Sequence, residues 1–144
     1  MSPLVKDLKS LDDIGTEILD GTIFKGTLRA IEGDNLGSHN IGGFVENFSR
    51  SSYFCIYCEI DRKTFETDPI FRGTKQTVHS HKDHVQSSDG NYTCNRGVKF
   101  DSVFNKLNYF HVCQPGLPPC FGHDLFQGIV SSDLALYIKH LVRV

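Results

Sequence analysis

Phe54-Cys-Ile-Tyr-Cys58 opens the stretch of sequence that decides the fold, and His79-Ser-His81-Lys-Asp-His84 lies near its end. Both motifs fall within residues 51–96, a segment with many charges and few apolar side chains for its length. Such a segment buries too little apolar surface to order itself by packing alone. We therefore expect a bound metal ion to stabilise it.

Zinc is the metal that this pattern predicts, because cysteine thiolates and histidine nitrogens at short spacings are its usual structural ligands. The favoured four-ligand set is Cys55, Cys58, His79 and His84. His81 could replace His79, and Cys94 is a further candidate. Twenty residues, 59–78, separate the two halves of this set, against roughly 12 to 15 in a DNA-reading finger. We predict a structural zinc site; the alternative is a solvated loop with two free cysteines.

Two more cysteines, Cys113 and Cys120, flank the proline-rich stretch Gln114-Pro-Gly-Leu-Pro-Pro119. They could form a second metal half-site, but we find no histidine at a convincing spacing from them. We therefore predict that both are buried thiols.

Helical spacing of apolar residues marks both ends of the chain. Residues 3–14 have Ser2 as a possible N-cap and a proline in the first turn, and residues 123–142 predict helix, either as one element or as two helices that meet near Ser131-Ser132. Residues 22–31 are rich in Thr, Ile, Phe and Leu, which indicates one or two strands that end at the turn Gly33-Asp34-Asn35. A short helix is possible over residues 41–48. The fold class expected from these elements is α+β.

Composition limits the classes of function. The chain has 39% hydrophobic and 22% charged residues, which is ordinary for a globular protein, and its net charge is −2. A free-standing DNA-binding protein usually has a surplus of basic residues, so we expect DNA to be bound weakly or another protein to be the partner. No apolar run approaches the roughly 20 residues of a membrane span, and no signal peptide is evident. We expect an intracellular protein with reduced thiols, no membrane partner and no small-molecule substrate.

Three runs of sequence carry a resemblance to a known family: residues 32–44, Phe54-Cys-Ile-Tyr-Cys58 and residues 116–129. Together they resemble the transposases of eukaryotic cut-and-paste DNA transposons of the CACTA/EnSpm-like class. The resemblance implies a partial RNase-H-like core with a small zinc-binding insertion. Residues 1–50 would form the first part of that core, residues 51–96 the insertion, and residues 97–144 the return to the core.

The resemblance also assigns roles within an Asp-Asp-Glu catalytic set. Asp34 looks like the second carboxylate that binds Mg²⁺, and Gln127 stands where the family has a glutamate. A carboxamide has no charge with which to hold Mg²⁺ and cannot act as a general base. The first aspartate would lie on a strand upstream of residues 3–14, and we expect the chain to start too late to contain it.

We therefore expect a transposase-derived zinc-binding fragment that is not catalytic and is nuclear if it functions. Magnesium would be a cofactor only if the protein were active in DNA strand transfer or cleavage. One alternative is an active Mg²⁺-dependent nuclease that combines Asp34 with Asp124 or Glu32. The other is a zinc-dependent protein-interaction module unrelated to transposition.

Overall fold

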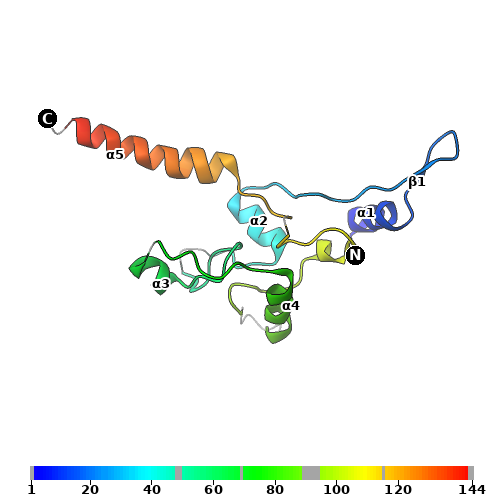
Figure 1. Cartoon of the computed structure of the whole chain (residues 1–144), viewed down its shortest axis with the longest axis horizontal. Coiled ribbons are helices and arrows are strands. Elements are labelled where there is room, and N and C mark those ends of the chain that lie inside the picture. Colours follow the sequence, from blue (N-terminus) through cyan, green and yellow to red (C-terminus); the bar gives the residue numbers. More distant parts are fainter. Residues whose placement is uncertain (1, 48–49, 69, 89–94, 115, 143–144) are drawn as a thin grey trace.

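The computed structural model describes residues 2–47, 50–68, 70–88, 95–114 and 116–142 (Figure 1). The α-helices and strands are α1 (Pro3–Asp13), β1 (Thr16–Glu17), β2 (Ile23–Phe24), α2 (Asn35–Gly42), α3 (Arg62–Thr67), α4 (Val78–Ser87) and α5 (Ser131–Leu141). The 3₁₀-helix η1 spans Val103–Lys106, and the π-helix η2 spans Phe121–Val130. Helices combined with a small antiparallel sheet confirm the α+β class.

Helix α1 matches its prediction closely. The Ser2 hydroxyl accepts a hydrogen bond from the backbone N–H of Val5 over 3.4 Å, and so caps the first turn. Val5 is buried, and Gly15 follows the helix in the left-handed region at a φ of 89°. The capping residue, the first-turn proline and the terminating glycine act through near neighbours, which is why the sequence pattern located this helix.

The prediction of one or two strands over residues 22–31 was wrong for most of that range. Only Ile23–Phe24 forms a strand, which pairs antiparallel with β1 through Thr16↔Phe24 and Glu17↔Ile23. Residues 25–34 have no regular structure. The side chains of Ile23 and Phe24 are both exposed, so β-branched and aromatic composition did not lead to a buried strand here.

Helix α2 begins earlier in the chain than the helix expected over residues 41–48. Asp34 is its N-cap, with the side chain accepting a hydrogen bond from the N–H of Gly37 over 2.6 Å. Gly43 ends the helix at a φ of 77°, a left-handed conformation that glycine adopts without strain. The predicted turn at Asp34 is therefore the start of a helix.

The hydrophobic core is built from segments between the helices. Its buried residues are Phe44, Ile56, Val98, Leu107, Phe110, Val112 and Leu117. Isolated bridges join these segments, among them the antiparallel bridge of Phe44 with Val98. Phe44, Ile56 and Val98 come from the three parts of the chain that the sequence distinguished, so those parts share one core.

Helices η2 and α5 form a continuous rod that extends away from the rest of the molecule (Figure 1). None of their described side chains is buried. These two elements confirm helix over residues 123–142, and η2 passes into α5 between Val130 and Ser131, where the two-helix alternative placed the junction. Across the described ranges, no helix is both long and apolar enough to cross a bilayer.

Candidate metal centre

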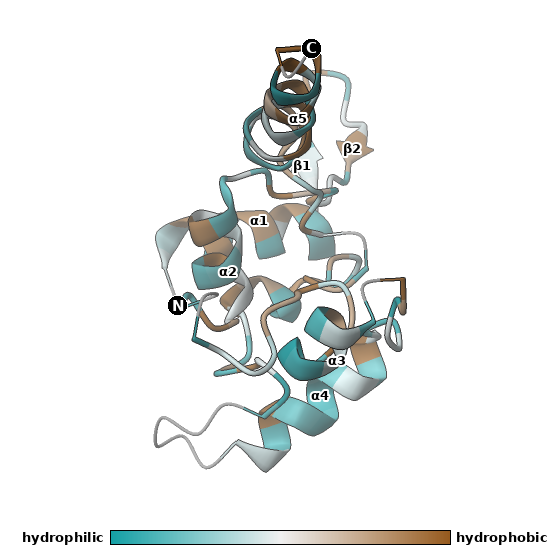
Figure 2. Ribbon diagram, turned by 90° about the vertical axis from the view of Figure 1, so that its left-hand side faces the viewer, coloured by the Kyte–Doolittle hydropathy of each residue, from teal (hydrophilic) through white to brown (hydrophobic). Residues whose placement is uncertain are grey.

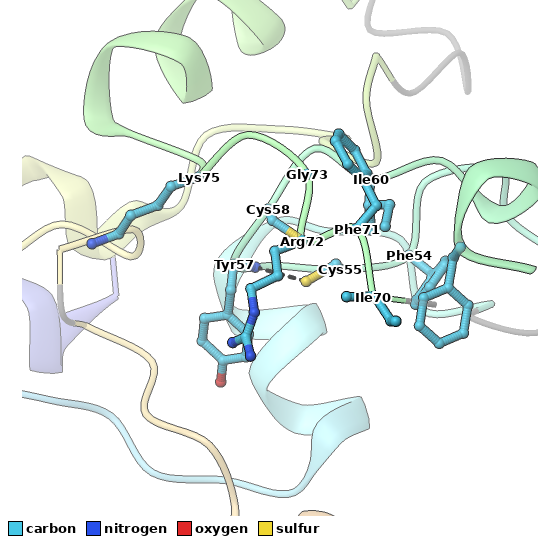
Figure 3. Close-up of a pocket in the computed structure, with 11 residues that line it drawn as sticks. Phe54, Cys55, Tyr57, Cys58, Ile60, Ile70, Phe71, Arg72, Gly73 and Lys75 are labelled. Atoms are coloured by element: carbon cyan, nitrogen blue, oxygen red, sulfur yellow. Dashed lines mark hydrogen bonds between the residues drawn. The ribbon is translucent and has the colours of Figure 1, made fainter. Parts of the chain in front are cut away.

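The Cys55–Cys58 turn brings two thiols side by side at the edge of a groove of about 800 Å³ (Figure 3). The backbone N–H of Tyr57 donates a hydrogen bond to Cys55 Sγ over 3.4 Å, which holds the turn tight. Burial, together with the hydrogen bond and the charge of Cys55, raises the pKa of the Cys58 thiol to about 11. A metal ion bound to Cys58 would favour its thiolate form, against the effect of burial.

Two of the candidate histidines point to different surroundings on α4, a helix that begins with a capping box between Thr77 and Ser80. The side chain of His79 is 91% exposed, and its Nε2 lies 3.4 Å from Asp83 Oδ2. The side chain of His84 is largely buried, and its Nε2 lies 3.2 Å from Glu59 Oε1. Each of these rings therefore already faces a carboxylate.

His81, the alternative ligand, is fully buried, with 0% of the residue exposed. Its ring packs edge-on against His111 and Phe44, with centroids 5.1 Å and 5.6 Å away. Neither ring nitrogen of His81 has a hydrogen-bond partner within the described residues. Burial, and then the charge of His111, lowers the pKa of His81 to about 4. His81 is therefore a neutral ring in the core.

The structure does not bring the predicted zinc ligands together. No three His, Cys, Asp or Glu side chains converge as a metal-holding group among the residues that the structure describes. The two thiols are adjacent, whereas the histidines of α4 face carboxylates or the core. Cys94 lies outside the described residues.

Asp34 lies beside the start of η2, although the two are far apart in sequence. Asn35 Nδ2 donates a hydrogen bond to Asp124 Oδ1 over 2.8 Å, and the backbone N–H of Cys120 donates to Asp124 Oδ2 over 2.9 Å. Asp124 therefore links the first turn of η2 to the first turn of α2. Gln127, on the next turn of η2, is exposed.

A thiol–imidazole pair lies at the same end of η2. Cys120 Sγ is 3.2 Å from His123 Nδ1. This hydrogen bond lowers the pKa of the Cys120 thiol and raises the pKa of the His123 imidazole. Cys113 and Cys120 are both of intermediate exposure, so the prediction of two buried thiols was wrong, although Cys113 packs against the hydrophobic core. The two-residue spacing of Cys120-Phe-Gly-His123 is the signal that could have revealed the pair.

Comparisons with protein-family models, with curated proteins and with solved structures find no match to this chain.

Proposed function

We propose that this chain is a transposase-derived protein that binds zinc through the Cys55–Cys58 turn and does not cleave DNA. The hydrogen bond from Asn35 to Asp124 carries the proposal, because it joins two of the segments on which the resemblance rests. The acidic residues of a two-metal site must converge from separate segments. Contact between the Asp34 turn and η2 supports a partial RNase-H-like core in which such residues once met.

The hydrogen bonding around Asp34 argues against DNA cleavage. Both carboxylate oxygens of Asp124 accept hydrogen bonds, and Asp34 Oδ1 caps α2. Gln127 adds no negative charge. Two divalent ions need several anionic oxygens around them, and no cluster of three acidic side chains is found in the described part of the chain.

The local surroundings of the cysteine turn support zinc binding. Cys55 and Cys58 are partly buried and adjacent, and helix α3 beside them has no buried side chain. Ile56 and Ile60 on the same segment are buried, and a metal ion held by the two thiols would add its binding free energy to the folding free energy that this packing supplies.

The exposed rod of η2 and α5 favours protein as a partner, alongside weak binding to DNA. Leu134, Tyr137, Ile138 and Leu141 recur at helical spacing on α5, and all are exposed. Figure 2 shows apolar segments along this rod, away from the core. Repeats of this kind are typical of a helix face that packs against another apolar surface.

An Mg²⁺-dependent nuclease is the second candidate function, because Asp34 and Asp124 are neighbours that come from separate segments. We expect the wild-type chain to leave duplex and single-stranded DNA intact with Mg²⁺ or Mn²⁺. Asp34→Ala should behave identically, as should Asp133→Ala, an acidic control on the exposed rod. Gel analysis of end-labelled DNA measures this. Metal-dependent cleavage by the wild type that disappears in Asp34→Ala alone would establish the nuclease instead.

A further inference from the structure

A thiol and an imidazole face each other at the base of the rod that η2 and α5 form (Figure 1). Cys120 is the N-cap of η2, and its Sγ lies 3.2 Å from Nδ1 of His123, which belongs to the first turn of the same helix. Because both residues belong to one turn, the pair forms without any movement of distant segments.

Backbone hydrogen bonds hold this turn in place. The N–H of Cys120 donates to Asp124 Oδ2 over 2.9 Å, and the N–H of Asp124 donates to the carbonyl oxygen of Cys120 over 2.7 Å. Asp124 Oδ1 also accepts a hydrogen bond from Asn35, which fastens the turn to α2. The thiol and the imidazole therefore project from a backbone that is fixed at both its own turn and a neighbouring helix.

The surroundings of the pair favour a thiolate beside an imidazolium. Hydrogen bonds from the side chain and the backbone of His123 lower the pKa of the Cys120 thiol. The hydrogen bond and charge of Cys120, followed by the charges of Asp34 and Asp124, raise the pKa of the His123 imidazole. A thiolate next to a protonated histidine at the start of a helix is the arrangement that makes a cysteine nucleophilic.

The pair is open to small reagents. His123 is exposed and Cys120 is partly exposed. Apart from its chain neighbours, a Cβ atom added at Gly122 would come within 4 Å of Cys120 Sγ alone among the described residues, at 3.9 Å. Glycine at this position therefore leaves one flank of the thiol uncovered.

Two other thiols of the chain have the opposite surroundings. Burial raises the pKa of Cys113 to about 12. Burial, together with the hydrogen bond and charge of Cys55, raises the pKa of Cys58 to about 11. Both thiols stay protonated at neutral pH, and the protonated thiol is not the nucleophile. Cys120 should therefore react ahead of Cys58 and Cys113.

We propose that Cys120 is a site of reversible oxidation by hydroperoxides, with His123 as the proton donor. Cys120 Sγ attacks one oxygen of hydrogen peroxide, so that an S–O bond forms and the O–O bond breaks. The sulfur loses two electrons and becomes a sulfenic acid, while the second oxygen leaves as hydroxide and takes the proton of the His123 imidazolium to form water. This site goes beyond the proposed zinc function and does not depend on it.

Reversal requires a small thiol as the reductant. One molecule of the thiol condenses with the sulfenic acid to give a mixed disulfide and water, and a second molecule releases Cys120 by thiol–disulfide exchange.

The test exposes the full reduced chain to hydrogen peroxide at pH 7, traps sulfenic acid with dimedone, and measures the rate at each cysteine by peptide mass spectrometry. Ser132→Cys supplies the matched reference, an exposed thiol on the same rod with no histidine in the following turn. Cys120 should be trapped about 10-fold faster than this introduced thiol, because an ordinary thiol is mostly protonated at pH 7 and the gain in thiolate is partly offset by lower intrinsic nucleophilicity.

His123→Ala should slow trapping at Cys120 to about the rate of the introduced thiol. His140→Ala removes another exposed histidine of the rod and should leave the rate unchanged. Circular dichroism checks that both variants are folded. An equal rate at Cys120 in the wild type and in His123→Ala would overturn the proposal. So would a Cys120 that reacts no faster than the thiol introduced by Ser132→Cys, a comparison that stands even if His123→Ala does not fold.

Elemental analysis of the same wild-type sample counts bound zinc. Fast trapping at Cys120 in a folded chain that does not bind zinc would overturn only the proposed zinc function. Slow trapping in a chain that binds zinc would overturn only the oxidation site.

Discussion

Gly43→Ala is expected to destabilise the protein by about 3 kcal/mol, from the left-handed backbone and overpacking together. Gly43 has a φ of 77°, and a Cβ atom added there would lie 2.1 Å from the carbonyl oxygen of Phe100. That oxygen belongs to backbone, which cannot rotate away as the end of a flexible side chain can. Gly43 also accepts hydrogen bonds from the N–H groups of Lys99 and Phe100, so the clash occurs where two core segments meet.

Gly21→Ala is the matched control for this prediction. Gly21 has a similar φ of 81°, but an added Cβ would meet only Glu17 Oε1, at 3.8 Å. This variant should lose about 1 kcal/mol, from the backbone conformation alone. Urea unfolding followed by circular dichroism measures both variants. Equal losses at the two positions would contradict the close approach of Gly43 to Phe100.

His81→Leu is expected to remove much of the acid sensitivity of the fold. Burial lowers the pKa of His81 from 6.5 to about 4, so between these two pH values the unfolded chain binds a proton that the folded chain does not. Acidification in this range therefore favours unfolding, whereas above pH 6.5 the effect is absent. A shift of this size corresponds to roughly 3 kcal/mol of stability lost on acidification.

The measurement compares the free energy of unfolding at pH 7 and at pH 4.5 in the wild type and in His81→Leu. His39 and His111 should leave some residual slope, because burial lowers their pKa values too. His79→Ala, at an exposed position of the same helix, should retain the full wild-type slope. If His81→Leu is as acid-sensitive as the wild type, His81 is not a buried neutral ring.

These two predictions concern the parts of the molecule on which the proposed site depends. Gly43 ends α2, and the first residue of that helix, Asn35, donates a hydrogen bond to Asp124. Phe44 follows the helix directly, and its ring packs against His81. Loss of the turn at Gly43 or of the His81 packing would loosen α2 and Phe44, and the first turn of η2 is hydrogen-bonded to α2. Zinc affinity should therefore be measured only on variants that are shown to be folded.

Local patterns in the sequence were sufficient for features that depend on near neighbours. Ser2 capping Val5, the helix junction at Ser131 and the pairing of Cys55 with Cys58 each involve residues within a few positions of one another. Their hydrogen bonds and spacings are set within one turn, so composition and periodicity predict them well.

The arrangement of distant segments was decided only by the tertiary structure. Asp34 became a helix cap, His81 entered the core, and Asp124 came within hydrogen-bonding distance of Asn35. Each outcome depends on contacts between segments that are far apart in the sequence. The hydrogen bond from Asn35 to Asp124, for example, joins residues 89 positions apart. Burial and charge proximity are properties of the packed chain. The spacing of Cys120 and His123 was readable in the sequence, but the hydrogen bonds by which Asp124 joins α2 to the backbone of Cys120 were not.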